Sequence, residues 1–313
     1  YDILNVICEV IIMLKIYMLI MFKYLIYGSS VFFTGRLTEA VDVLDVIALR
    51  FLMSFAVFLL LRVLKIIKTD FRHKPIKPLL FAALFEPVLY FFFETMGISR
   101  TTTLTAGIII AFTPVVTCAA GSLILKEKTT LLQKLFLLSS VCGVMLIICM
   151  TKTTGGENTP FGIVCMFLAI LSGAFFCVFS RQSSKCFSAI EITYFSSILG
   201  ALVFNTINVL RHIALGTLNT YFSPYMKFDN LIGFFFLSVL STIAATCANN
   251  YVLSKIPVSR AASFGGISTL ITIAEGVIFN HEHLYVYHIV GVLLILGGVY
   301  GVNKFSKNNG KAV

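Results

Sequence analysis

Long apolar runs alternate with short polar connections along most of this chain of 313 residues. A helix that spans a bilayer needs about 20 predominantly apolar residues. The runs have about that length, and charged or turn-forming residues mark their ends. The pattern predicts an all-α membrane protein with ten transmembrane helices, near residues 16–35, 44–66, 77–97, 101–125, 129–150, 161–181, 190–212, 230–252, 258–279 and 284–304.

The same spacing of glycine and glutamate occurs twice. Each of three positions is repeated 155 residues later: Gly121 by Gly276, Glu127 by Glu282 and Gly143 by Gly298. We therefore predict two homologous halves of five helices, residues 16–150 and 161–305, joined by a Gly/Thr/Pro-rich linker at 151–160. An odd number of crossings inverts the second half relative to the first, which is the architecture of many secondary transporters.

Composition supports a membrane location. Hydrophobic residues make up 58% of the chain and charged residues 12%, and the mean hydropathy is +0.96. A soluble protein of this length needs far more polar surface. The net charge of +10 would suit nucleic acid, but Lys and Arg lie between apolar runs and form no basic domain with interleaved aromatics. We expect the lipid bilayer as a partner and no nucleic acid.

The basic residues favour one side of the membrane. The connection at 62–77 carries six Lys or Arg residues, whereas the preceding connection has Arg36 against three acidic residues. Later basic clusters fall on the same side, near 126–134, 181–185, 255–260 and 304–311. Because Lys and Arg concentrate in cytoplasmic loops, both termini are predicted to be cytoplasmic. The short loops suit the inner membrane of a bacterium.

The third segment holds the strongest candidate site. Helical spacing of four places Glu86, Tyr90 and Glu94 on one stripe, which we expect to face a cavity and not lipid. Pro87 removes a backbone donor, so a local kink is predicted beside Glu86. An ionisable group inside a bilayer is expensive and needs a reason. One possible reason is that Glu86 binds a proton or a cation. The other is that it forms a structural hydrogen bond to a neighbouring helix.

Other polar residues within the apolar segments extend this candidate site. Glu94 corresponds to Asn249 at the offset of 155 residues, and Asn250 follows it. Asn205 in the seventh segment and Glu275 in the ninth add further polar groups, although each Asn is equally well explained by hydrogen bonds between helices. These residues are predicted to bind substrate or a coupling ion.

Arg50 is interpreted as the one Arg or Lys several residues inside an apolar segment. It would bind an anionic substrate group or pair with an acid, and pairing with Asp45 or Glu94 is the favoured alternative. Pro114 is expected to break the fourth helix just after Thr113.

Metal and cofactor sites are not predicted. The cluster of His281, Glu282, His283 and His288 lies at a helix end and lacks the H-E-x-x-H spacing. Glu282 has a twin, Glu127, with no histidine nearby, so it is assigned to the repeat. The eight cysteines form no C-x-x-C motif, and those in apolar runs are expected to pack as small apolar residues.

Several of these motifs resemble the drug/metabolite transporter superfamily, in particular its EamA-type members. The resemblance rests on the Gly–Glu–Gly repeat, on Arg50, and on "IYGSSVFF" at 26–33, "FTPVVTCAAGSLILKEK" at 112–128 and "ANNYVLSKIPVSRAASF" at 248–264. It implies that helices 1–4 and 6–9 surround a central cavity, with helices 5 and 10 at the periphery. Two departures are Tyr27, where a Trp is usual, and Thr269, at the position matching Pro114.

These observations favour a secondary active transporter of a small organic metabolite, such as an amino acid, an amine or a drug-like compound, working by alternating access with protons as the candidate coupling ion. A sugar-phosphate or nucleotide-sugar exchanger is less favoured, because phosphate needs fixed cations in the cavity and Arg50 is the one expected there. No catalytic motif is present, so we predict no enzyme; a membrane-embedded enzyme or a scaffold remains the alternative from another class. The Gly297 and Gly301 pair allows close helix packing or a dimer seam, so a monomer or homodimer is expected.

Overall fold

The computed structural model describes residues 2–72, 74–124, 131–151, 158–262 and 264–304, and within these ranges it contains helices and no strands. By length and composition, seven helical spans of the described residues are able to cross a membrane: Met13–Ala40, Val43–Val63, Ile76–Ile98, Pro160–Ser183, Ala189–Leu215, Phe228–Lys255 and Arg260–Phe279. Two shorter apolar helices are Thr103–Thr117 and Val286–Gly301. The prediction of an all-α membrane protein is confirmed at this level.

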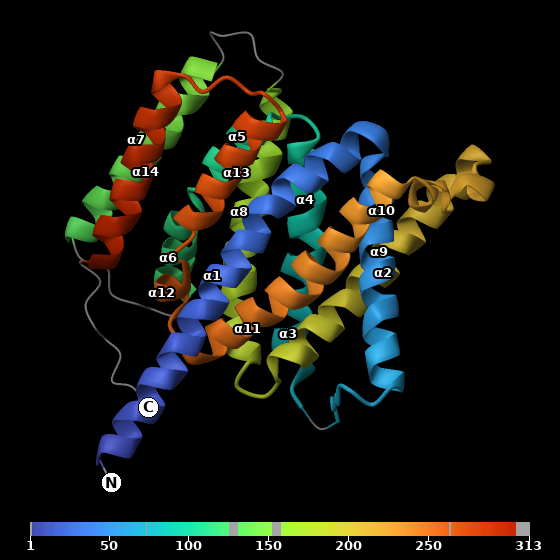
Figure 1. The fold of residues 1–313 in the computed structure, drawn as a ribbon, viewed down its shortest axis with the longest axis horizontal. Helices are drawn as coiled ribbons and strands as arrows, with labels where there is room; N and C mark the ends of the chain where they lie inside the picture. The colour runs from blue at the N-terminus through green and yellow to red at the C-terminus, as the bar shows by residue number, and fades with distance from the viewer. Residues whose placement is uncertain (1, 73, 125–130, 152–157, 263, 305–313) are drawn as a thin grey trace.

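Figure 1 shows the helices in their order along the chain. The first part of the chain contains α1 (Asp2–Ala40), α2 (Val43–Val63), α3 (Ile76–Ala83), η1 (Leu84–Leu89), α4 (Tyr90–Ile98), α5 (Thr103–Ile110), α6 (Thr113–Ile124) and α7 (Leu131–Thr151). The second contains α8 (Pro160–Ser183), α9 (Ala189–Leu215), η2 (Leu218–Thr220), η3 (Ser223–Met226), α10 (Phe228–Phe235), η4 (Phe236–Ala245), α11 (Thr246–Lys255), α12 (Val258–Ala262), α13 (Gly266–Phe279) and α14 (Val286–Lys304).

Capping residues explain several of the helix starts. Thr102 caps α5, Thr159 caps α8, and Ser188 forms a capping box with Glu191 at the start of α9. At the other end of α9, Gly216 adopts the left-handed conformation with φ 68°, which ends the helix. These short polar signals separate helices whose interiors are almost entirely apolar.

Helices in the first part of the chain and helices in the second part make similar contacts. α1 packs on η4 and α13, and in the same way α8 packs on α4 and α6. α2 lies against α9, and α7 lies against α14 at one edge of the bundle (Figure 1). The third span of each part also contains a π-helical stretch, η1 in one and η4 in the other. The main contacts of α1 and α8 therefore resemble each other.

Two spans are interrupted near the middle of the bundle. The first break lies at Ala111 and Phe112, between α5 and α6. The break that Pro114 predicts in the fourth helix is therefore present, but it lies just before Thr113 and not after it. Pro114 stands in the first turn of α6, where a backbone N–H would have no acceptor within the helix. The second break precedes Gly266, so the span that has Thr269 in place of a proline is interrupted as well.

The repeated glutamate has a structural role in the second part of the chain. Glu282 accepts hydrogen bonds from the backbone N–H groups of Thr103 (2.9 Å) and Leu104 (2.7 Å), the first residues of α5. A Cβ on Gly276 would lie 3.3 Å from Glu282 Oε2, so the glycine leaves room for the carboxylate. Glu127 and most of the predicted linker, 152–157, lie outside the described residues.

Glycines also bring helices of the two parts into close contact. A Cβ on Gly28 of α1 would lie 2.8 Å from Ser268 O and 2.8 Å from Ile271 Cβ of α13, which is closer than real side chains approach. Gly301 faces the ring of Phe136 on α7. Of the predicted Gly297 and Gly301 pair, Gly301 therefore serves packing inside the chain, whereas a Cβ on Gly297 would meet open space.

We expect the Gly28→Val variant to unfold at a clearly lower temperature in detergent than the native protein. The added side chain overpacks the contact between α1 and α13, which costs about 1–3 kcal/mol of the free energy of unfolding. Gly297→Val is the matched control, since its Cβ meets no atom within 4 Å. Equal unfolding midpoints for the two variants would contradict the close packing of α1 on α13.

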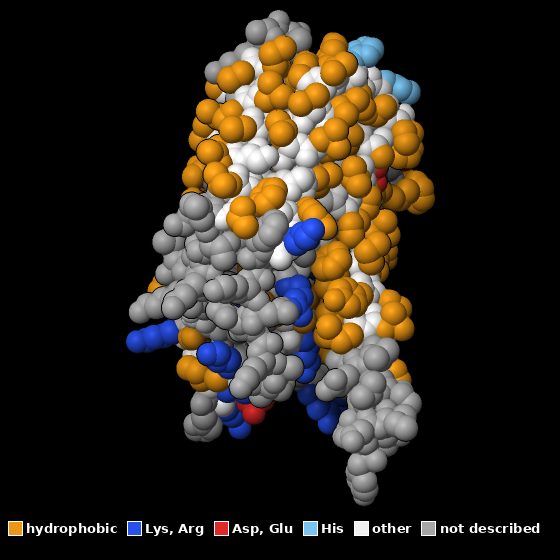
Figure 2. Space-filling view, turned by 90° about the vertical axis from the view of Figure 1, so that its left-hand side faces the viewer, with side chains coloured by type: hydrophobic (Ala, Val, Ile, Leu, Met, Phe, Trp, Pro, Cys, Tyr) orange, Lys and Arg blue, Asp and Glu red, His pale blue; other side chains and the backbone are white. Residues whose placement is uncertain are grey.

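One end of the molecule carries most of the visible Lys and Arg side chains. Figure 2 shows them gathered toward the end where the chain begins, while hydrophobic side chains predominate among the coloured side chains over the rest of the visible described surface. The histidines seen in that view lie at the opposite end. An apolar girdle with cations at one end is the distribution that the positive-inside pattern produces.

Candidate functional site

A cavity of about 110 Å³ lies inside the bundle, which is room for several water molecules or a small solute. Its walls come from both parts of the chain and include residues at or next to both helix breaks. The lining residues are Lys23, Tyr24, Tyr27, Ser30, Glu86, Tyr90, Phe91, Glu94, Ile110, Thr113, Pro114, Gly173, Cys177, Ser241, Asn249, Ala262, Gly265 and Ser268. The predicted stripe of Glu86, Tyr90 and Glu94 thus faces one cavity.

Glu86 reaches the cavity because its helix is broken there. Its backbone is extended, with φ −139° and ψ 113°, inside the π-helical stretch η1. Pro87 explains this conformation, since a proline disfavours the helical region for the residue before it. The predicted kink is therefore present. The carboxylate of Glu86 has no hydrogen bond or ion pair with any residue that the structure describes, so its oxygen atoms are available to a ligand or a proton.

Glu94 stands two turns further along the same span and is only 4% exposed. The hydroxyl of Tyr90 donates a hydrogen bond of 2.8 Å to Glu94 Oε1. A buried carboxylate that accepts a hydrogen bond is held in one orientation. The two acids of the stripe therefore differ: Glu94 is bonded within its own helix, and Glu86 is not.

Lys23 of α1 also lines the cavity, and sequence analysis missed it. Its side chain is 2% exposed, and its ammonium group donates a hydrogen bond of 2.8 Å to Asn249 Oδ1 on α11. The ammonium also lies 4.3 Å from the centre of the Tyr24 ring, in cation–π contact. A lysine in the middle of the first apolar run was the available signal. The interpretation of Arg50 as the one such cation is wrong.

Comparison with known proteins agrees with this architecture. The model of the EamA-like transporter family matches the chain over residues 14–149 and again over 160–304. The chain belongs to the EamA-like transporter family. This EamA family member has apolar helices long enough to span a membrane, and its relatives are named as transporters, so it is a multi-pass membrane transporter. Neither the family description nor the names of the relatives mention catalysis.

Two relatives come from Bacillus subtilis (strain 168), and neither name gives a substrate. "Uncharacterized transporter YcxC" is 32% identical over 284 residues, which cover 91% of each chain. "Uncharacterized transporter YetK" is 26% identical over 282 residues, which cover 88% of this chain and 82% of the relative. A solved structure titled "Crystal structure of protein" matches with a TM-score of 0.63 at 14% identity, over 92% of this chain and 96% of that one, and therefore shows a shared fold.

In this EamA family member, Arg50 is buried beside the cavity and not among the residues that line it. Its guanidinium donates hydrogen bonds to Thr242 Oγ1 (2.8 Å) and Ser241 Oγ (3.0 Å), and it lies 4.1 Å from the centre of the Phe91 ring. The predicted pairing with Asp45 is wrong, and the ion pairs among the described residues include none between Arg50 and Glu94. Arg50 joins α2 to η4.

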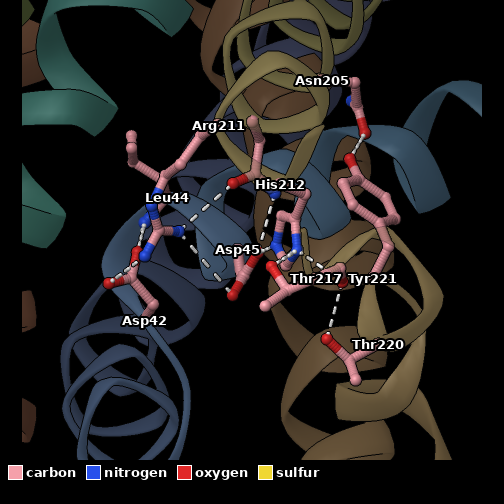
Figure 3. A network of polar contacts seen from close by, with 10 residues as sticks. Asp42, Leu44, Asp45, Asn205, Arg211, His212, Thr217, Thr220 and Tyr221 are labelled. Atoms are coloured by element: carbon pink, nitrogen blue, oxygen red, sulfur yellow. Dashed lines mark hydrogen bonds and ion pairs between the residues drawn. The ribbon is translucent and has the colours of Figure 1, made fainter. Parts of the chain in front are cut away.

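Asp45 instead belongs to a polar network between α2 and α9 (Figure 3). His212 Nε2 lies 2.8 Å from Asp45 Oδ1, and the amide of Asn208 donates to the same oxygen at 2.8 Å. Arg211 forms an ion pair of 2.9 Å with Asp42. These contacts fasten the ends of two helices and lie apart from the cavity-lining residues.

Two of the predicted amides hold helices together. Asn205 donates to the carbonyl oxygen of Ala48 on α2 at 3.0 Å and accepts from the Tyr221 hydroxyl at 2.6 Å. Asn250 accepts from Ser180 on α8 at 2.7 Å and donates to Thr193 on α9 at 3.0 Å. Neither lines the cavity. Among the predicted amides, Asn249 alone is a lining residue.

Glu275 also stands outside the set of lining residues. Its Oε1 accepts a hydrogen bond of 2.6 Å from Ser29 of α1, and its buried Oε2 has no hydrogen-bond partner among the described residues. The structure therefore brings Glu86, Tyr90, Glu94 and Asn249 together around one cavity, and it separates Arg50, Asn205, Asn250 and Glu275 from them.

Proposed function

We propose that this chain is a secondary active carrier that moves a small organic metabolite, such as an amino acid, an amine or a drug-like compound, by alternating access. The observation that carries the proposal is the central cavity, where a broken helix presents a carboxylate that has no hydrogen bond or ion pair with the residues the structure describes. Interrupted helices that expose polar groups to a cavity are typical of transporter binding sites.

The proposed carrier has ten crossings, arranged as two inverted repeats over 16–150 and 161–305 with a linker at 151–160. Support comes from the two separate family matches, from the reciprocal packing of α1 and α8, and from the π-helical stretch in each third span. The gathering of Lys and Arg at one end supports cytoplasmic termini. The proposed location is the plasma membrane of a bacterium, as monomer or homodimer.

Glu86 is the proposed site for a coupling proton. A carboxylate inside the membrane-spanning part of a protein is a typical element of a proton relay. The ionisable groups that share the cavity with it are Lys23, Tyr24, Tyr27, Tyr90, Glu94 and Cys177. Tyr90, Glu94 and Asn249 are proposed to shape the site around the substrate.

The alternative within the same class is a sugar-phosphate or nucleotide-sugar exchanger. Lys23 supplies a cation in the cavity, but two glutamates share the cavity with it and repel a phosphate dianion. The alternatives from another class are a membrane-embedded enzyme and a scaffold that moves no solute.

Counterflow in proteoliposomes tests the carrier proposal. Purified protein is reconstituted, loaded with one unlabelled compound at a time from a panel of amino acids, amines and sugar phosphates, and given a trace of the labelled compound outside. We expect accumulation of the label well above that in protein-free liposomes for at least one amino acid or amine. Exchange confined to sugar phosphates would favour the alternative carrier, and no exchange for any compound would contradict transport.

A further inference from the structure

Lys23 presents a buried positive charge to the cavity. Its side chain is 2% exposed and comes from α1, whereas Glu86 lines the same cavity from η1. A buried charge is costly unless hydrogen bonds or an opposite charge compensate it. The side-chain oxygen Oδ1 of Asn249 and the face of the Tyr24 ring provide part of this compensation.

The ammonium group of Lys23 has donors to spare. A lysine carries three N–H donors, and within the described part of the chain Lys23 uses one of them, toward Asn249. The ion pairs of the described residues include neither Lys23 nor Glu86. The two opposite charges thus face the same cavity without neutralising each other in direct contact.

This arrangement selects for a ligand that carries both charges. A ligand with only a cationic group would satisfy Glu86 and meet repulsion from Lys23, and a ligand with only an anionic group would meet repulsion from Glu86 and Glu94. A zwitterion is able to place its anionic group at Lys23 and its cationic group at Glu86. The rings of Tyr27 and Phe91 offer an apolar surface for the remainder of the ligand.

We propose that Lys23 is a specificity-determining residue that binds the carboxylate of a zwitterionic substrate while Glu86 binds its ammonium group. The inference rests on the carrier function proposed above and narrows its substrate class. Arg50 is the other buried cation near the cavity, but its guanidinium is bonded to Ser241 and Thr242 and does not line the space. Lys23 is therefore the cation that a ligand in the cavity reaches.

The test compares amino acids with their decarboxylated amines, for example phenylalanine with 2-phenylethylamine and leucine with 3-methylbutylamine. Binding is measured by calorimetry in detergent for the native protein and for Lys23→Met. We expect the native protein to prefer the amino acid. In Lys23→Met, amino acid binding weakens about tenfold to hundredfold, the loss of one charge-assisted interaction, while amine binding is unchanged or tighter.

Two further variants distinguish recognition from folding. Lys23→Arg keeps the positive charge and is expected to retain the preference for amino acids. Lys15→Met is the matched control, because Lys15 lies on the same helix, is exposed and faces the Tyr251 ring at 5.7 Å. Each variant is checked for a single symmetric peak in size-exclusion chromatography before binding is measured.

Three results would overturn the assignment: equal binding of amino acid and amine by the native protein, equal weakening of both by Lys23→Met, or no binding of any amino acid in the panel. Counterflow measured with the same compounds distinguishes a failure of the Lys23 assignment from a failure of the carrier proposal. Binding that depends on Lys23 without counterflow would overturn the carrier function alone, and counterflow without discrimination between amino acid and amine would overturn the role of Lys23 alone.

Discussion

Substitution of Glu86 by Gln is expected to abolish the response of transport to a pH gradient. The change keeps the shape of the side chain but removes the group that takes up and releases a proton. In proteoliposomes with an imposed pH gradient, we expect the native protein to move substrate against its concentration gradient and Glu86→Gln to fail to do so, with a fall in initial rate of about tenfold or more. Initial uptake rates with and without the gradient measure the effect.

Two comparisons make this result specific to Glu86. Glu94→Gln removes the second acid of the stripe, which is bonded to Tyr90, and we expect a smaller loss of the response to pH. Glu39→Gln removes an exposed acid on α1 outside the cavity and is expected to behave like the native protein. Because Glu86 has no hydrogen bond among the described residues, its substitution should leave the unfolding temperature nearly unchanged. An undiminished response to the pH gradient in Glu86→Gln would rule out the coupling role.

Much of the fold could be predicted from the sequence because the membrane imposes one local rule. Apolar runs of about 20 residues must form helices that satisfy their own backbone hydrogen bonds. The stripe of Glu86, Tyr90 and Glu94 could be found for the same reason, since helical spacing is a local property and a carboxylate avoids lipid. The break at Glu86 followed from Pro87, which acts on the residue directly before it.

The partners of single polar residues could not be predicted in the same way. Asn250 and Asn249 are adjacent in sequence, yet one bonds Ser180 and Thr193 between helices and the other bonds Lys23 in the cavity. The rotation of a helix about its axis decides which of two neighbours faces the cavity, and that rotation is set by packing against distant helices. Sequence spacing within one helix carries no information about it.

Arg50 and Lys23 illustrate the same difficulty for charges. Both are cations inside apolar segments, and the sequence around Arg50 predicts a pairing with Asp45 or Glu94. Asp45 is instead held by His212 and Asn208 of α9, both of which are more than 160 positions away in sequence. An ion pair depends on which helices are neighbours, so a residue's own segment identifies the charge but not its partner.

The second large effect is expected for Glu282→Ala. Its carboxylate accepts from two backbone N–H groups at the start of α5, where the helix dipole also favours a negative charge. Hydrogen bonds to a charged group contribute about 1.5–3 kcal/mol each, so we expect a loss of about 3 kcal/mol in the free energy of unfolding. The unfolding midpoint in detergent measures the loss, with Glu39→Ala as the exposed control.

Gly276, the glycine that precedes Glu282 in the repeated motif, provides a second test of this cap. A Cβ at position 276 would lie 3.3 Å from Glu282 Oε2 and 3.3 Å from Leu104 N, so Gly276→Ala is expected to disturb the cap. Residues that act through one contact give non-additive effects. Gly276→Ala should therefore lower the unfolding midpoint in the native background and change it much less once Glu282 is Ala. Fully additive losses would contradict a shared role for the glycine and the glutamate, because the glycine would then be needed for some contact other than this cap.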